Sequence, residues 1–227
     1  MPPFRPFAAD HLGALAATGA VVAAAVWFAR KSPVRAVVVG RVWAVFLLVA
    51  QLLNPVLLAH RGELTLQEGL PLDLCDLTSF FGAWALWTRT IPAFEFAYFW
   101  GLSGTLLAMA TPPLAHGFPD PEFVHYFLVH SGGVGGVLFL LFGAGLRPRP
   151  GAALRVYGWT AAYAASVGLV NLALNANYFW LRAKPDNTVL DLFGDWPWYI
   201  AGAALLAAAL FLLLGLPFRG SRDPHLG

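Results

Sequence analysis

The residues most able to do chemistry gather in one short stretch, Leu70 to Ser79, which contains Cys75, the only cysteine of the chain. Asp73 and Asp76 flank this thiol at the start of a run that otherwise has the composition of a membrane-spanning helix. A charged side chain inside such a helix costs about 2.5–3.5 kcal/mol on insertion scales, so ionisable residues there are candidates for function. A thiol activated by a base can act as a nucleophile, whereas a lone membrane cysteine can also be a small packed hydrophobe.

Helical spacing separates these groups. Asp73 and Asp76 are three residues apart and are expected on one helical face, while Cys75 points about 100° away from Asp76. Ser79, four residues after the thiol, shares its face. The acids are therefore not simple activators of Cys75, and a base must come from another segment.

His130, in a later apolar run, is the candidate general base for Cys75. The alternative is a buried imidazole that bonds to a neighbouring helix. His125 lies five residues earlier, a poor spacing for one helical face. A zinc site needs three or four convergent ligands, which Asp76 and the two histidines could supply, but no HExxH motif is present. We predict no metal and no cofactor.

The composition requires a lipid environment. Hydrophobic residues make up 59% of the chain and charged residues 11%, and the mean hydropathy is +0.66, far from the values of soluble domains. The net charge of +2 is too small for a nucleic-acid partner, and one cysteine excludes an internal disulfide. No signal peptide pattern precedes the first apolar run, which we expect to be a retained span.

Seven apolar runs approach the length of about 20 residues that a membrane span needs, namely 12–29, 36–59, 72–88, 93–110, 122–142, 152–174 and 196–216. We predict an all-α, multi-pass protein of the cell membrane, with one integral membrane domain over residues 1–227. One set of ends and loops carries ten basic residues, Arg30, Lys31, Arg35, Arg41, Arg89, Arg147, Arg149, Arg155, Arg219 and Arg222. The other set carries four, Arg5, Arg61, Arg182 and Lys184. This bias predicts an outside N-terminus and a cytoplasmic C-terminus.

In that topology the polar residues of the spans collect in the outer half of the membrane. They are Gln51, Asn54, Asp73, Cys75, Asp76, Thr78, Ser79, Thr105, His125, His130, Ser131, Asn171 and Asn175. Polar groups in a membrane seek one another or a wet cavity, so we predict an outward-facing polar pocket. The inner half holds mainly Glu95, which we expect to pair with Arg89.

Two further groups of polar residues have two interpretations each. Asn171 and Asn175 either bond across helices or support the base and an oxyanion. Arg182 and Lys184, in the loop that follows, either are solvated or hold a lipid phosphate.

Three motifs, in order along the chain, resemble a known family. LPLDLC at 70–75 resembles the LPLHLC signature of the YwaF-like bacterial integral membrane proteins, with Asp73 in place of histidine. FVHYFLVH at 123–130 is similar to that family's FRYFxFFLLH span. NYFWLRAKP at 177–185 and LDLFGDWPWY at 190–199 are similar to its NYMFLRxKP…LLDxLGPWPWY region, with Asp195 as a departure. The likeness runs from about Gln51 to Tyr199.

That family is distantly similar to eukaryotic lipid acyltransferases of the transmembrane protein 164 type. A cysteine and a histidine are implicated there in acyl transfer to lysophospholipids, and by motif they correspond to Cys75 and His130. The resemblance implies a thiol-dependent acyltransferase or lipid hydrolase whose partner is membrane phospholipid. The competing hypotheses are a small-solute transporter or sensor with Asp73, Asp76 and His130 as a proton-linked site, and a non-catalytic scaffold.

Overall fold

The computed structural model of the chain describes residues 1–186 and 188–219. The regular structure of these residues is helical, and their only strand-like feature is an isolated bridge between Pro3 and His116. The longer helices are α1 (Ala9–Ala29), α2 (Pro33–Arg61), α3 (Leu74–Thr88), α4 (Ile91–Trp100), α5 (Leu106–Ala110), α6 (Pro121–Phe142), α7 (Ala152–Leu174) and α8 (Trp198–Gly215). A π-helical turn, η1 (Gly101–Thr105), joins α4 to α5, and the 3₁₀ turns are η2 (Tyr178–Trp180), η3 (Val189–Phe193) and η4 (Leu216–Phe218).

Helices occupy all seven apolar runs of the sequence, with α4, η1 and α5 together covering the fourth. Four of the described helical segments are long and apolar enough to cross a membrane: α1, α2, α6 and Trp198–Phe218. Most helices begin one to three residues before the expected start, whereas α3 begins at Leu74 rather than at 72 and α8 begins at Trp198 rather than at 196. The tail beyond residue 219, with Arg222, lies outside the described residues.

Local chemistry fixes several helix ends. The Ser32 hydroxyl caps α2 by accepting from the Arg35 main-chain N–H at 3.2 Å, and Pro33 fills the first helical position. Gly62 ends the same helix at a φ of 72°, a left-handed conformation that glycine adopts without strain. Asp120 caps α6 through the Glu122 N–H at 2.8 Å.

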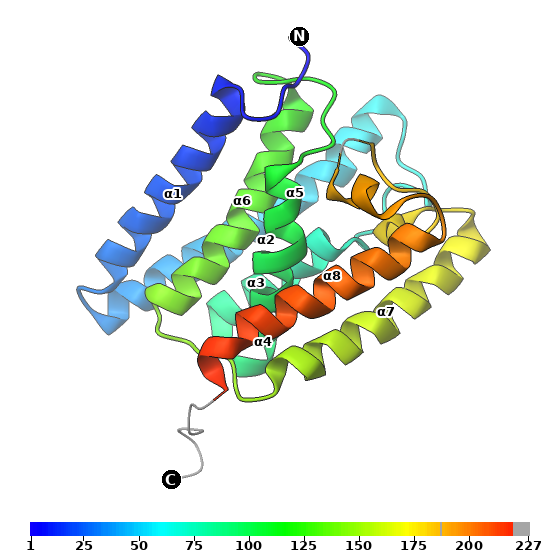
Figure 1. The fold of residues 1–227 in the computed structure, drawn as a ribbon. Helices are drawn as coiled ribbons and strands as arrows, with labels where there is room; N and C mark the ends of the chain where they lie inside the picture. Colours follow the sequence, from blue (N-terminus) through cyan, green and yellow to red (C-terminus); the bar gives the residue numbers. More distant parts are fainter. Residues whose placement is uncertain (187, 220–227) are drawn as a thin grey trace.

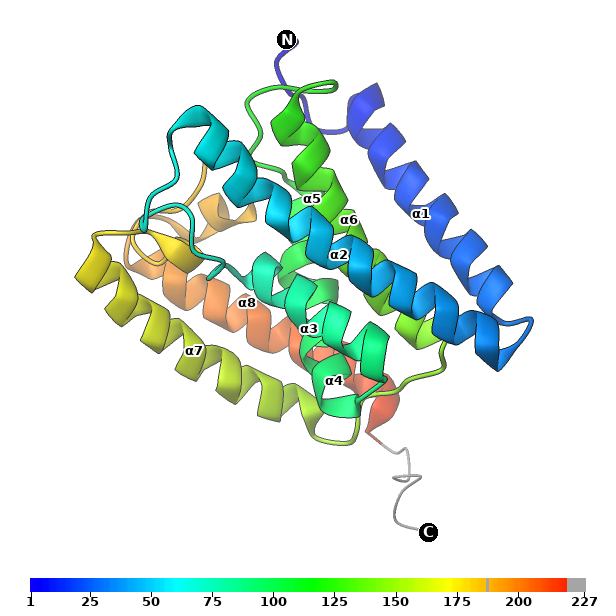
Figure 2. The same ribbon diagram turned by 180° about the vertical axis from the view of Figure 1, so that it is seen from behind.

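Successive helices run in alternating directions, so the loops gather at two ends of the bundle (Figures 1 and 2). The N-terminal end is formed by residues 1–8 and the segments 62–73, 111–120, 175–186 and 188–197. The basic end is formed by the loops at 30–32, 89–90 and 143–151 and by residues 216–219. The larger set of basic loop residues lies at the basic end, and the smaller set lies at the N-terminal end.

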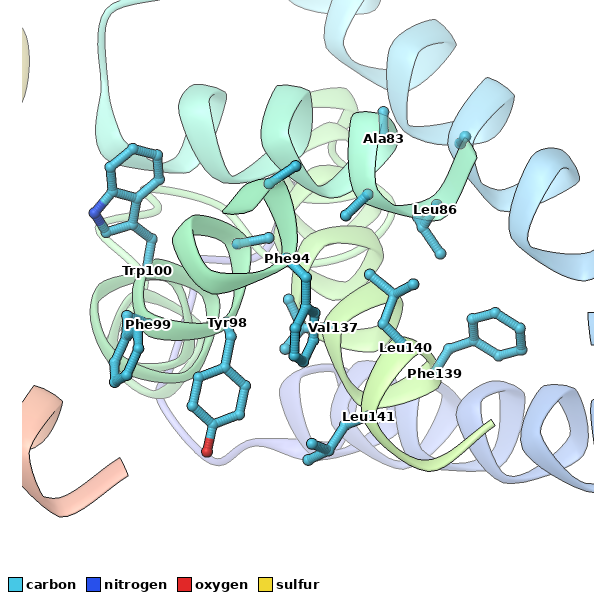
Figure 3. Packing of buried hydrophobic residues seen from close by; sticks show 14 of the residues in the cluster. Ala83, Leu86, Phe94, Tyr98, Phe99, Trp100, Val137, Phe139, Leu140 and Leu141 are labelled. Atoms are coloured by element: carbon cyan, nitrogen blue, oxygen red, sulfur yellow. The ribbon is translucent and has the colours of Figure 1, made fainter. Parts of the chain in front are cut away.

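The apolar core lies between α3, α4 and α6, where Phe94, Phe99, Val137 and Phe139 are fully buried (Figure 3). Glycines of α6 bring this helix against α2.

A Cβ at Gly135 would lie 2.7 Å from Trp43 of α2, and one at Gly132 would lie 2.8 Å from Leu47. The Trp43 indole N–H donates to the Gly132 carbonyl at 3.0 Å. Small residues at a helix contact allow such close approach. The packing therefore fixes the helix that carries His130 against the helix that carries Gln51.

Candidate functional site

Asp73, Cys75 and Asp76 lie at the very start of α3. Asp73 is the N-cap residue and Asp76 occupies the third helical position, and the two form a capping box. The Asp73 side chain accepts from the Asp76 N–H, and Asp76 Oδ2 accepts from the Asp73 N–H at 3.0 Å. The expectation that both acids lie within the helix is therefore wrong for Asp73, whose extended backbone precedes the first turn.

Each carboxylate also holds a second segment of the chain. Asp73 Oδ1 accepts from the main-chain N–H of Phe179, in η2, at 2.6 Å. Asp76 Oδ1 accepts from the amide Nε2 of Gln51, in α2. Both acids are half-buried. Together they tie α2, α3 and η2 into one cluster at the N-terminal end.

The charge of this carboxylate pair is not balanced by the protein. Among the described residues, no Lys, Arg or His forms an ion pair with Asp73 or Asp76. The charged groups around Asp73 are also negative, namely Asp76 and Glu68. The Oε1 atom of Gln51 is buried and accepts no hydrogen bond from the described residues.

Cys75 lies between the two acids and is half-buried. The Thr105 hydroxyl lies near the Cys75 thiol and donates to Thr78 Oγ1 at 3.2 Å. Thr78 in turn donates to the Leu74 carbonyl at 2.8 Å. Thr105 is the last residue of the π turn η1, a feature that is frequent at functional sites. Ser79, expected on the face of Cys75, donates to the Cys75 carbonyl at 3.1 Å and not to the thiol.

His130 has one ring nitrogen fixed by the helix that carries it. Its Nδ1 lies 2.8 Å from the carbonyl oxygen of Tyr126. Because a carbonyl can only accept, Nδ1 carries the hydrogen, and Nε2 of the neutral ring presents a lone pair. This is the tautomer that a general base acting through Nε2 requires.

Tyr126 is a neighbour of His130 that sequence reasoning missed. Its ring stacks on His130 with centroids 3.9 Å apart, and its hydroxyl donates to the Ala108 carbonyl at 2.7 Å. The position four residues before His130 is the signal that could have found it, since residues i and i+4 share a helical face. No direct hydrogen bond joins Cys75 to His130 within the described part of the chain, although α3 packs against α6.

Two other predicted pocket residues lie on α2 and α6. His125 is close to the main chain of Ala50, and its Nε2 is buried with no hydrogen-bond partner among residues 1–186 and 188–219. Asn54 lies in α2 directly before Pro55 and is half-buried.

Asn171 serves as a clamp. Its Nδ2 donates to the Tyr178 carbonyl at 2.8 Å and its Oδ1 accepts from the Tyr178 N–H at 2.9 Å. The Tyr178 hydroxyl donates to the Leu66 carbonyl at 2.8 Å and accepts from the Leu70 N–H at 3.0 Å. Burial raises the pKa of Tyr178. Asn171 thus anchors the loop that leads into Asp73, and Tyr178 is a second residue that sequence reasoning missed.

The predicted headgroup residues have different surroundings. Arg182 is exposed, donates to Asn175 Oδ1 at 2.7 Å, and borders a groove of about 440 Å³ whose other walls include Leu169, Leu172 and Trp196. Lys184 forms an ion pair with Asp191 at 2.9 Å and donates to the Gly194 carbonyl at 3.1 Å. Of the two cations, Arg182 is the one beside an apolar groove.

The basic end contains a different charged cluster. Glu95 is 3% exposed and accepts from Arg149 through the main-chain N–H at 2.8 Å and through Nε at 2.9 Å. Arg155 Nη2 lies 3.2 Å from the same carboxylate. The expected pairing of Glu95 with Arg89 is wrong, because Arg89 ends α3 at a φ of 59° and its buried Nη2 has no acceptor among the described residues.

Comparison with known proteins identifies the family. The chain matches the TMEM164 family over residues 6–215, and it belongs to that family. The resemblance to the transmembrane protein 164 type is thereby confirmed. Neither a curated protein nor a solved structure gives a significant match. Family membership and the four apolar helices make the chain a multi-pass helical membrane protein.

Proposed function

We propose that this member of the TMEM164 family is a membrane-embedded, thiol-dependent acyltransferase or hydrolase that acts on the acyl chains of membrane phospholipid. One observation carries the proposal. The only thiol of the chain, Cys75, lies in the first turn of α3, beside α6, where the Tyr126 carbonyl holds His130 with Nε2 as the basic atom.

In this mechanism His130 Nε2 takes the proton of the Cys75 thiol, and the thiolate attacks the ester carbonyl of a phospholipid. The tetrahedral oxyanion collapses, the ester C–O bond breaks, and the released lysophospholipid alkoxide takes the proton from His130. The acyl group is then bound as a thioester. Attack by a lysophospholipid hydroxyl completes transfer, whereas attack by water releases a fatty acid, and either step restores the thiol.

The helix start supports the oxyanion. The first main-chain N–H groups of a helix have no intrahelical acceptor, and the helix dipole adds partial positive charge there. In α3 these are the N–H groups of Leu74 and Cys75, because the Asp76 N–H is held by Asp73. We propose them as oxyanion donors, and Asn171 as a support of the fold rather than of the base.

Arg182 supports a headgroup site. It places a cation at the edge of a groove with apolar walls, the combination that a phosphate with an attached acyl chain requires. Lys184 has a smaller role in the proposal, because Asp191 already balances its charge.

We also propose that seven helical segments cross the membrane, with the N-terminus outside and residues 1–227 forming one membrane domain. The alternating helix directions and the basic loops at one end support this orientation. The three motifs further favour kinship with the YwaF-like bacterial proteins. In right-side-out vesicles, a membrane-impermeant maleimide added outside should therefore label Cys75.

The second candidate is a small-solute transporter or sensor. One observation favours it: Asp73 and Asp76 lack a cationic partner among the described residues, as expected of groups that bind a moving proton or solute. A Cys75→Ala variant separates the two, because it leaves solute flux intact and abolishes acyl transfer.

The decisive assay uses the full chain in liposomes with a fluorescent phospholipid and a lysophospholipid acceptor. Acyl transfer and fatty-acid release should fall at least about 100-fold in Cys75→Ala, given the size of nucleophilic contributions. Ser79→Ala is the matched control, because its hydroxyl bonds only the Cys75 carbonyl, and it should retain turnover within a few-fold. Equal turnover of wild type and Cys75→Ala would end the enzyme hypothesis.

A further inference from the structure

The strongest unexplained feature is the uncompensated negative charge at the start of α3. Asp73 and Asp76 hold each other in a capping box, and every hydrogen bond that fixes them comes from a neutral donor: main-chain N–H groups and the Gln51 amide. Each carboxylate oxygen has two lone-pair directions, so acceptor capacity remains on both. Burying charge without a counter-charge is costly, and the cost falls when a cation is present.

Gln51 supplies an independent sign of a ligand. The residue is only 7% exposed, and its Nε2 donates to Asp76, which holds its amide at the carboxylate pair. The Oε1 atom of the same amide is buried and has no donor among the described residues. A buried carbonyl oxygen of this kind is a missing hydrogen bond unless something positive lies beside it.

The sequence predicts no metal, but on these contacts we propose that Asp73, Asp76 and Gln51 bind a divalent metal cation, Ca²⁺ or Mg²⁺. All three residues offer oxygen, which these hard cations prefer, and two carboxylates balance a charge of +2. The ligands come from α2, from the start of α3 and from the loop before it, so the bound cation joins segments far apart in the sequence. With three protein residues in the site, water completes the coordination shell, and we expect a Kd of about 10⁻⁴–10⁻³ M, as in extracellular calcium modules.

The site has a consequence for Cys75, and this part rests on the proposed function. The proposed thiol lies between the two acids along the chain. A cation bound there would fix the start of α3, which carries Cys75, and its removal should loosen that turn.

Binding can be tested without lipid turnover. The full chain in nanodiscs is stripped with EDTA, and its unfolding is followed by the fluorescence of its nine tryptophans. CaCl₂ or MgCl₂ is titrated against NaCl at matched ionic strength, with ethanolamine hydrochloride as an ammonium probe. Equilibrium dialysis with radioactive Ca²⁺ gives the stoichiometry. At about ten times Kd, linkage raises Tm by about 3–5 °C for a chain of this size.

The test variants remove charge and keep shape. Asp76→Asn retains an oxygen that accepts from the Asp73 N–H, so the helix start survives. Asp73→Asn has one oxygen for the two main-chain N–H groups of Asp76 and Phe179, so Asp76→Asn is the principal variant. Gln51→Met removes the amide oxygen. Each should lose most of the metal-induced rise in Tm, while Glu63→Gln, an exposed residue after α2, should keep it.

Three results would overturn the proposal. The first is a wild-type Tm that rises with divalent metal no more than with NaCl. The second is a metal-induced rise in Tm that is as large in Asp76→Asn as in wild type. The third is a rise in Tm with ethanolamine but with neither metal, which would make the site one for ammonium. A protein that binds the metal and does not turn over lipid would refute only the proposed function.

Discussion

Two carboxylate clusters, at opposite ends of the bundle, differ in how their negative charge is balanced. At the basic end, Glu95 is bonded to Arg149 and Arg155, so its charge is balanced within the protein. At the N-terminal end, Asp73 and Asp76 are held only by neutral donors. A buried charge with all its partners is a structural element, whereas one that lacks a counter-charge is a candidate for binding or catalysis.

The two clusters also differ in the residues that surround them. Glu95 closes the 143–151 loop onto α4, next to the aromatic core that contains Phe94 and Phe99. Asp73 and Asp76 lie where three segments meet and where polar atoms remain without partners, among them Gln51 Oε1. The charge at the basic end is therefore balanced by the protein itself, and the N-terminal end is where we propose that binding and chemistry take place.

The largest expected effect comes from breaking the balanced cluster. Glu95→Ala removes the acceptor of two arginines and should lower the free energy of unfolding by about 3 kcal/mol, the lower end of the range for buried pairs, because both arginines are partly exposed. Chemical denaturation in detergent micelles measures it. Glu63→Ala, at an exposed site, is the control and should change the value by less than about 0.5 kcal/mol. A Glu95→Ala protein as stable as the control would remove the structural role assigned to this cluster.

A smaller effect is expected from the unbalanced cluster. Asp76→Asn keeps an acceptor for the Asp73 N–H and removes one of two like charges, so in metal-free buffer it should change stability by less than about 1 kcal/mol. The same denaturation experiment measures it. A loss as large as that of Glu95→Ala would make the two clusters alike and would contradict the contrast between them.

Much of the fold could be predicted from the sequence, because apolar runs and their boundaries are local signals. Pro33 after Ser32 marks the start of α2, and Gly62 marks its end. The Asp73-x-x-Asp76 spacing is itself a capping-box pattern, so the role of Asp76 was readable from local spacing. The seven-span topology and the orientation stay predictions.

The site was less accessible to sequence reasoning, because its contacts join distant segments. Asn171 and Tyr178 lie within one turn and loop, but the Tyr178 hydroxyl reaches Leu66 and Leu70, more than 100 residues away in sequence. Glu95 was paired with the nearest arginine, whereas the fold brings Arg149 to it. Spacing along a helix cannot reveal such partners, since they depend on how the helices pack.

The central claim is that His130 activates Cys75, and the chain allows a direct test because it has a single thiol. The measurement is the rate of alkylation of the purified protein by iodoacetamide at neutral pH, followed by intact mass. The account predicts that His130→Gln slows alkylation at least about tenfold, since a positioned base contributes that much or more, while His125→Gln changes it less than about twofold. Equal rates in wild type and His130→Gln would contradict the account.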